Sequence, residues 1–316
     1  MNDNLRNWLL DGDASIVCQT MDFLGYKQKE IENKRNEISN KGWGKRLLEN
    51  QAADGSFGGG LYGPKFISTT YTLLLLKRMG INSNQKCCQK GASLLIQGLR
   101  KDGGINFSRK EDVRGETCIT GMTLNLLSYF QTGKEQQDQI FQYITENQMD
   151  DGGWNCQYPR KANHGSFNTT MLVLEGLQSF KKQPEQQQKT IAMIENLENK
   201  GQEFLLNHKL YKSHTTGDIV KEDFLRFPFP YQWKYDVLTA LDYFQSSNAS
   251  YDERLEDAIQ LVESKTEEGY LKNYRGQSGK IWFILETVGK PSRYNTLRWQ
   301  RILRWWKKSQ KIKYLD

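Results

Sequence analysis

The sequence has little proline and no long apolar run. Only 6 of its 316 residues are proline, and no stretch rich in proline, glycine and serine resembles a linker. No run of about 18 apolar residues could span a bilayer, and no basic segment followed by an apolar one begins the chain. Apolar residues make up 37% of the chain and aromatic residues 12%. We therefore expect one folded, soluble domain over residues 1–316.

Cysteine is also scarce, and its number is odd. The five cysteines are Cys18, Cys87, Cys88, Cys118 and Cys156. An odd number without a secretory signal is typical of reduced thiols rather than a disulfide framework. We expect a cytoplasmic protein.

Excess charge is missing from most of the chain. From Arg293 onward there are eight Lys or Arg and one Asp, which accounts for the whole net charge of +7. The preceding 292 residues carry equal numbers of basic and acidic side chains. Nucleic-acid binding normally needs a broad basic face, so we expect no nucleic-acid partner.

A repeat of about fifty residues runs through the chain. Three segments align: Gln51-Ala-Ala-Asp-Gly-Ser-Phe57, Leu99-Arg-Lys-Asp-Gly-Gly-Ile105 and Gln148-Met-Asp-Asp-Gly-Gly-Trp154. Thr70, Thr120 and Thr170 follow, each opening an apolar run at a spacing of 50. A fixed period of this length indicates a repeat architecture.

Each unit predicts a pair of helices. The segment Asp138–Asn147 places Ile140, Phe141 and Ile144 on one face and suits an outer helix, which Asp-Gly-Gly then ends. The segment Thr169–Phe180 is apolar nearly all round and suits a buried inner helix. We predict an all-α fold, an α/α toroid of the α6/α6 type. Residues 1–44 would form degenerate N-terminal helices, and residues 45–316 five helix-pair repeats.

The segment Gln148–Trp154 resembles the Q-W motif (Q-x-x-x-G-x-W) of squalene and oxidosqualene cyclases, whose toroid the β subunits of protein prenyltransferases share. The resemblance covers roughly residues 45–310 and indicates a small, single-toroid member. It implies that Gln148 bonds at a helix end and that Trp154 packs on the neighbouring helix. It also implies an enzyme that holds an isoprenoid or other apolar substrate in its central cavity.

The acid motif D-x-D-D of those cyclases is absent from this sequence. Protonation of an unactivated alkene needs an unusually strong acid, so classical cyclisation is not expected. Three carboxyl groups near inner-helix mouths are instead the catalytic candidates: Glu116, Asp236 and, deeper in an inner helix, Glu175. Tyr62, Lys65, Trp233 and Tyr235 are the candidates for substrate binding, because aromatic rings stabilise carbocations and Lys65 could meet an anionic group. The simpler interpretation is that these aromatic residues plug the ring.

Four further residues suggest a metal. Cys118, Cys156, His164 and His214 follow one another in the outer-to-inner loops or at the adjoining inner-helix starts, which emerge on one face of a toroid. Two thiols and two imidazoles suit tetrahedral Zn²⁺, so the alternative function is a zinc-dependent transferase or lyase acting on a polar or peptide substrate. None has the tight spacing of a zinc motif, and a free cysteine is often only a small buried hydrophobe.

A third alternative is a toroid that binds a lipid or protein without catalysis. The basic C-terminal segment bears on it, since Trp299, Ile302, Leu303 and Trp306 share one helical face. This pattern is typical of an interfacial helix and predicts peripheral contact with anionic membranes. We favour the simpler interpretation, in which the same face packs as the last helix of the ring, because a closing helix must bury one face.

Overall fold

The computed structural model describes residues 1–110, 112–276 and 278–313. These contain thirteen α-helices: α1 (Asp3–Leu10), α2 (Ala14–Leu24), α3 (Gln28–Glu37), α4 (Gly42–Leu48), α5 (Thr69–Arg78), α6 (Lys86–Ser93), α7 (Thr117–Tyr129), α8 (Lys134–Glu146), α9 (Phe167–Lys181), α10 (Gln188–Asn207), α11 (Val237–Ser246), α12 (Glu256–Ser264) and α13 (Arg293–Lys313). Short 3-10 helices cover Leu94–Gly98, Glu222–Leu225 and Glu253–Leu255. The strands β1 (Thr266–Glu267) and β2 (Tyr270–Leu271) form an antiparallel hairpin.

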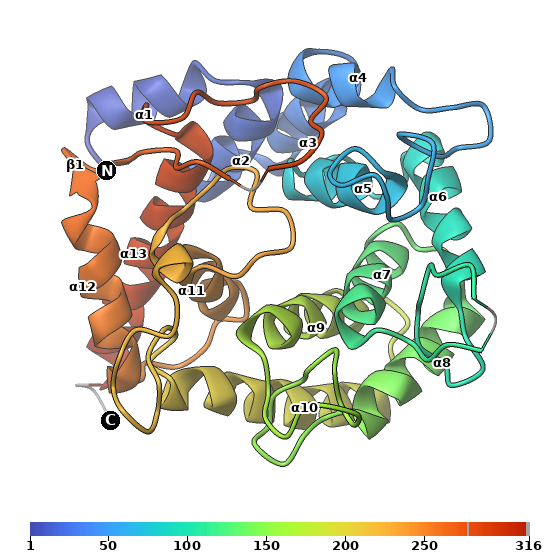
Figure 1. Ribbon diagram of the computed structural model, residues 1–316. Coiled ribbons are helices and arrows are strands. Elements are labelled where there is room, and N and C mark those ends of the chain that lie inside the picture. The colour runs from blue at the N-terminus through green and yellow to red at the C-terminus, as the bar shows by residue number, and fades with distance from the viewer. Residues whose placement is uncertain (111, 277, 314–316) are drawn as a thin grey trace.

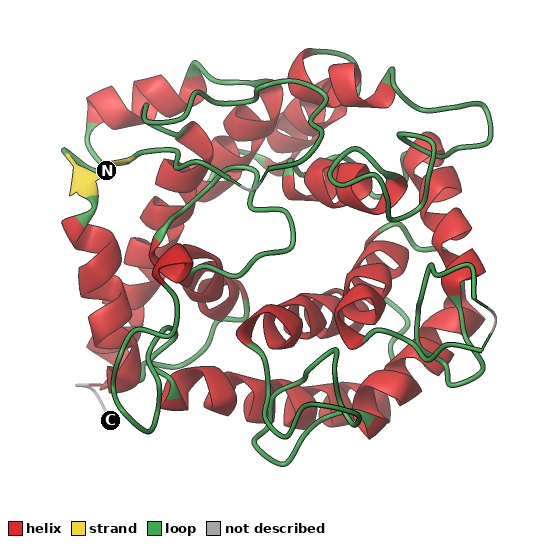
Figure 2. Ribbon diagram, viewed as in Figure 1, coloured by secondary structure: helices red, strands yellow, loops and turns green. Residues whose placement is uncertain are grey.

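The helices form two concentric rings, so the predicted α/α toroid is confirmed. The inner ring consists of α2, α5, α7, α9, α11 and α13, and each is preceded along the chain by an outer helix, α1, α4, α6, α8, α10 or α12 (Figure 1). Helix α3 is an addition between the first two pairs. Long loops connect the rings, and the short hairpin is the only strand structure among the described residues (Figure 2).

Burial follows the two predicted helix types. Every residue of α5 from Thr69 to Leu76 is buried, as expected for an inner helix with neighbours on all sides. In α8 the buried apolar residues Ile140, Phe141 and Ile144 lie on one stripe. The free energy gained by burying apolar surface therefore orders the chain as the apolar periodicity predicted.

A threonine at the start of several inner helices fixes the preceding loop. Its hydroxyl oxygen accepts a hydrogen bond from a buried backbone N–H, and the pairs are Phe57 N to Thr69 at 3.0 Å, Ile105 N to Thr120 at 2.9 Å, Trp154 N to Thr170 at 2.9 Å and Leu271 N to Thr296 at 3.0 Å. The first unit uses Thr69, so the sequence alignment on Thr70 was one residue out.

The Gln148 amide links two outer helices. It donates to the carbonyl of Gly152 at 2.9 Å and to that of Leu197, in α10, at 3.0 Å. Gln51 repeats the arrangement with Cys87, in α6, at 2.8 Å. Gln148 thus ties the loop after α8 to the middle of α10, rather than bonding at a helix end as the resemblance implied.

The Asp-Gly pair works differently from the prediction. Helix α8 ends at Glu146, before Asp151-Gly152, so this pair shapes the following turn rather than the helix end. Gly152 has a φ of +85°, which favours glycine. The Asp151 carboxylate accepts bonds from Gly153 N at 3.0 Å and Gly165 N at 2.6 Å, and so fixes the next loop.

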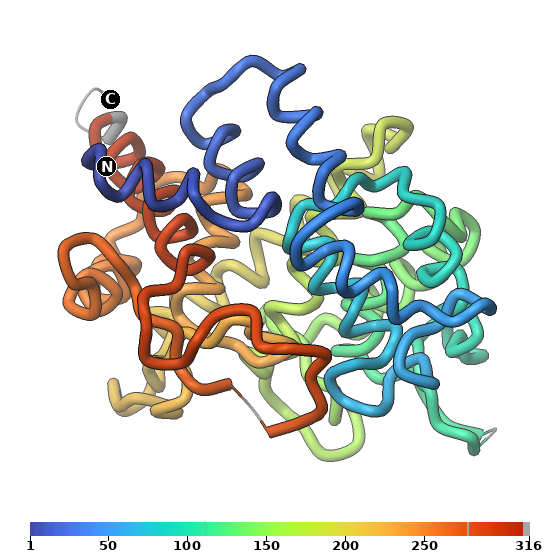
Figure 3. Tube along the Cα trace, turned by 90° about the horizontal axis from the view of Figure 1, so that it is seen from above, coloured from blue at the N-terminus to red at the C-terminus, as the bar shows by residue number. Residues whose placement is uncertain are grey.

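The C-terminal helix closes the ring against the N-terminal helices (Figure 3). The Arg293 guanidinium donates to the Trp8 carbonyl at 2.8 Å, and Arg304 stacks at 3.5 Å over the Phe23 ring. Trp299, Ile302 and Trp306 are buried. This burial contradicts the predicted interfacial helix, because its aromatic face is inside the protein. No helix of the described residues is both long enough and apolar enough to span a membrane.

Candidate active site at the mouth of the ring

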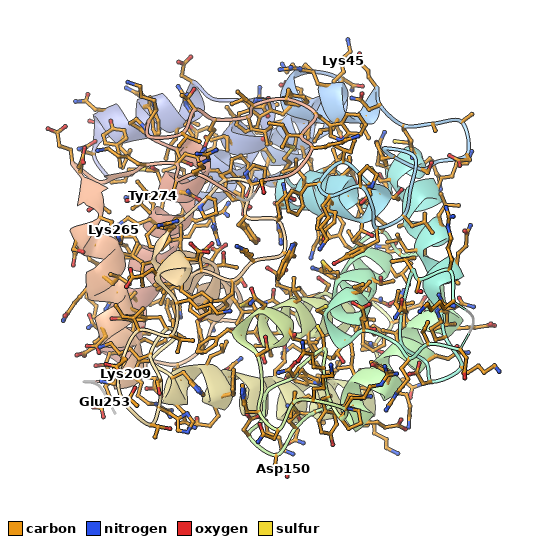
Figure 4. All side chains as sticks on the ribbon, in the orientation of Figure 1. Lys45, Asp150, Lys209, Glu253, Lys265 and Tyr274 are labelled. Carbon is orange, nitrogen blue, oxygen red and sulfur yellow. The ribbon has the colours of Figure 1, made fainter. Side chains whose placement is uncertain are left out.

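A large hollow lies where inner helices begin. It has a volume of about 1310 Å³ and lies among the start of α7, the loop from α8 to α9, the second half of α10 and the loop from α10 to α11. We call it the mouth cavity. Side chains project into the middle of the ring, and Asp150, which lines the cavity, is labelled in the loop after α8 (Figure 4).

One wall of the mouth cavity is aromatic. Phe167, at the first position of α9, has its ring centroid 5.6 Å from Phe204, 5.1 Å from Phe224 and 5.1 Å from His208. Trp233 lies across the cavity from the loop before α11. These rings offer an apolar surface that also attracts positive charge.

Two thiols lie beside one another in the same cavity. Cys118 is the second residue of α7, and Cys156 lies in the loop before α9, where its Sγ is 3.1 Å from Thr169 Oγ1. The Cys118 thiol stabilises the Cys156 thiolate, which lowers the pKa of Cys156 to about 7. The same interaction and burial raise the pKa of Cys118 well above its usual range. Cys156 is thus the thiol that can exchange a proton near neutral pH.

The predicted binding residues Tyr62, Lys65 and Trp233 come together at the rim. The Lys65 ammonium lies 5.1 Å from the Tyr62 ring centroid and 5.2 Å from that of Trp233. Burial raises the pKa of Tyr62 to about 12, so its hydroxyl stays protonated. The segment after residue 277 lies against this rim. Lys280 N donates to the Lys65 carbonyl and Phe66 N donates to the Lys280 carbonyl, both at 2.9 Å, and the Trp282 indole N–H donates to Thr72 Oγ1 at 3.0 Å.

A sequence model of the prenyltransferase alpha-alpha toroid domain matches residues 15–203. The chain belongs to the prenyltransferase alpha-alpha toroid family. Among solved structures it is similar to the apo type II terpene cyclase MstE from Scytonema, with 13% identity, a TM-score of 0.45, and coverage of 89% of this chain and 80% of that one. A variant of that enzyme in complex with geranylgeranyl dihydroxybenzoate gives 12% identity and a TM-score of 0.31 over 89% and 98% of the two chains. No curated protein matched the sequence.

The four predicted zinc ligands do not lie around a common point in the structure. Cys118 and Cys156 are adjacent, but the His164 ring is 2.9 Å from the Gly165 carbonyl, and His214 pairs with His208 at 3.0 Å. Within the described ranges no three His, Cys, Asp or Glu side chains are placed to hold a metal ion. The predicted four-ligand arrangement is therefore wrong, because only the two thiols converge.

The three predicted catalytic carboxyl groups separate. Glu116 directly precedes α7, two residues before Cys118 in the chain. Asp236 is 1% exposed and caps α11 by accepting a bond from Thr239 N at 2.7 Å, so it does not line the mouth cavity. Glu175 lies further along α9 and contacts Arg78 at 3.6 Å. Only Glu116 is placed to act with the thiols.

Tyr235 is also a structural residue rather than a surface for substrate. It does not line the mouth cavity, its hydroxyl donates to the Leu210 carbonyl at 2.6 Å, and its ring packs 5.2 Å from Phe167. Phe167, Phe204 and Phe224 form the aromatic wall in its place. The role of Phe204 could not be predicted from the sequence, because an aromatic residue on an outer helix is usually interpreted as part of the core.

Proposed function

We propose that this chain is an enzyme of the terpene cyclase or prenyltransferase type that binds an isoprenoid-like substrate in the mouth cavity. The observation that supports this most is the aromatic wall of Phe167, Phe204 and Phe224 facing a cavity that also contains a proton-exchanging thiol. Its volume of about 1310 Å³ exceeds what drug-sized ligands need, and so accommodates a long hydrocarbon chain.

The chemistry must differ from protonation of an alkene. A thiol with a pKa of about 7 is far too weak an acid for that step, but its thiolate is a suitable base. We infer that Cys156, with Glu116 nearby, removes a proton from a substrate that ionises on its own, for instance by losing an allylic leaving group. The aromatic wall would stabilise the resulting cation.

Binding is tested with geranylgeraniol, a plain isoprenoid alcohol, by isothermal titration calorimetry. Replacing Trp233 with Leu removes one ring of the cavity and should weaken binding roughly fivefold to tenfold, as expected from loss of about 1 kcal/mol. Trp43→Leu is the matched control, because Trp43 is also partly buried but packs against Phe229 outside the cavity. Absence of binding to the wild type, or equal losses in both variants, would reject the proposal.

The chemical role of the thiol is tested separately. With an isoprenoid that the enzyme converts into product, Cys156→Ser should lower kcat at least a hundredfold with little change in KM, since general-base catalysis contributes about that factor. Cys87→Ser is the control, because Cys87 is a partly buried thiol outside the cavity. Full activity in Cys156→Ser would remove the thiol from the mechanism and leave only the binding role.

A further inference from the structure

A second, smaller cavity lies further along the ring axis. Its volume is about 190 Å³, and its walls come from the inner helices α2, α5, α7, α9, α11 and α13 and from Tyr231 in the loop before α11. The mouth cavity is lined by Cys118 of α7, whereas this one is lined by Asn125, about 10 Å further along the same helix. We call it the axial chamber. At its rim Gln178 bonds Ser246 at 2.9 Å in an exposed position, so solvent reaches this end.

Cations outnumber carboxylates in the axial chamber. Glu175 is paired with Arg78 at 3.6 Å, and Asp242 is paired with Arg298 at 2.9 Å. Both carboxylates in the lining thus already have an arginine.

Two further cations in the lining have no carboxylate partner. The Lys77 amine donates to Ser179 Oγ at 2.8 Å and to Asn125 Oδ1, and Arg301 donates to Gln19 at 3.2 Å. Neither forms an ion pair with any described residue. Of the charged side chains in the lining, Lys77, Arg78 and Arg301 are basic and Glu175 and Asp242 are acidic, so the basic groups exceed the carboxylates by one.

A buried guanidinium group in the chamber also has a nitrogen without a hydrogen bond. The Arg78 side chain is 8% exposed and lines the chamber. Its Nη1 donates to the Gln232 carbonyl at 2.7 Å, whereas its Nη2 lies 3.6 Å from Glu175 Oε2 and forms no hydrogen bond with a described residue. Native proteins leave few buried N–H groups unsatisfied, and each such group needs an explanation. An oxygen ligand between Arg78 and Lys77 would supply it.

We propose that the axial chamber binds a small oxyanion with two negative charges, of the sulfate, phosphate or short dicarboxylate class. Lys77, once protonated, and Arg301 have no carboxylate partner and match the two negative charges. The volume sets the size, and guanidinium N–H groups match oxyanion geometry. This ligand is independent of the isoprenoid-like substrate, because the residues involved do not line the mouth cavity.

Binding should be coupled to proton uptake by Lys77. Burial lowers the pKa of Lys77 to about 7, helped by Arg78 and Lys182 and opposed by Glu175. The other charged groups of the lining are Asp242 and Arg301, and the Tyr129 ring lies 5.5 Å from the amine. A bound anion favours the charged amine and raises its pKa, so the amine takes up a proton on binding above pH 7. Affinity should then fall about tenfold per pH unit above pH 7.

Sulfate is the best probe, because its charge is constant across this pH range. Calorimetric titration at constant ionic strength is expected to show one saturable site whose affinity falls above pH 7, with proton uptake detected as a heat that depends on the buffer. Phosphate and malonate titrations then distinguish tetrahedral anions from dicarboxylates. No saturable sulfate binding, or binding with no proton uptake at pH 8, would overturn the proposal without any variant.

Lys77→Met assigns the binding to this chamber. It should abolish sulfate binding, whereas Lys134→Met, at a lysine whose side chain is 76% exposed on α8, should leave the affinity unchanged. Thermal melting checks that both variants are folded. Sulfate binding that survives in a folded Lys77→Met protein would place the anion elsewhere.

Discussion

The contact between Trp154 and α10 gives a sharp test of how neighbouring repeats hold together. Trp154 is 0% exposed, and its indole N–H donates to the Ile144 carbonyl at 2.9 Å. A Cβ built on Gly201 of α10 would lie 2.9 Å from the Trp154 ring and 2.9 Å from Leu174. Gly201 therefore makes room for this ring, and the two residues should be energetically coupled.

The structure sets the size of each effect. Trp154→Ala removes a fully buried aromatic ring and should cost about 3–5 kcal/mol. Gly201→Ala normally stabilises a helix by about 1 kcal/mol, but here the overlap with Trp154 should make it destabilising by about 1–3 kcal/mol. At about 2.1 cal/mol/K per residue, unfolding 316 residues has an entropy near 0.66 kcal/mol/K. Trp154→Ala should thus lower Tm by about 5–8 °C.

The assay is thermal unfolding of the two single variants and the double variant. Gln142→Ala on α8 is the control, because the Gln142 side-chain amide bonds to the Glu146 carboxylate on the exposed surface. Because Trp154→Ala creates the space that Gly201→Ala needs, the double variant should be less destabilised than the sum of the two single variants. Additive effects would show that the two residues are uncoupled. A Trp154→Ala protein that melts within about 1 °C of the wild type would refute the packing role altogether.

Three further outcomes are expected. Burial raises the pKa of Asp236 to about 6, so the folded state takes up its proton below pH 6 and its stability falls as pH rises from about 4 to 6. Asparagine caps a helix as well as aspartate does, so the free energy of unfolding of Asp236→Asn should exceed that of the wild type by up to about 3 kcal/mol at pH 7 and should not exceed it near pH 4. A variant less stable than the wild type at pH 7 would contradict this. Iodoacetamide at pH 7, followed by peptide mapping, should label Cys87 and Cys156 before buried Cys18, because the pKa values of Cys87 and Cys156 are lowered to about 6 and 7. The reverse order of labelling would be inconsistent with these pKa shifts. Elemental analysis of protein purified without chelator should find no stoichiometric zinc, since only two of the four candidate ligands converge, and one zinc per chain would restore the metal hypothesis.

The fold was predictable because it depends on local signals that recur. The period of about fifty residues and the two kinds of apolar pattern indicated the rings directly. Helix boundaries carry weaker signals: α10 begins at Gln188, although its first turns are polar and solvated and so lack an apolar pattern. The N-terminal region divides into α1 and α2, since Asp13 caps the second helix by accepting from Ser15 N at 2.9 Å.

The site could be predicted only in part. The sequence placed Cys118, Cys156, Glu116 and Trp233 at inner-helix mouths, and the structure brings them to one side of the ring. It could not show that His214 turns to His208, because that pairing depends on the path of a loop.

The axial chamber could not be predicted from the sequence either. In the sequence, Lys77 and Arg78 resemble ordinary basic residues in the last turn of a helix. They become buried only when the inner helices assemble around them.

Photo-crosslinking tests most directly whether the apolar substrate binds in the mouth cavity. A geranylgeraniol analogue with a diazirine on its terminal isoprene unit is irradiated with the wild-type protein, and the labelled residues are mapped by mass spectrometry. The label should lie within residues 156–169 and 204–233, the segments that contribute most of the lining of the mouth cavity. Excess geranylgeraniol should suppress the label. Labelling confined to the lining of the axial chamber, or to the outer surface without competition, would contradict the account.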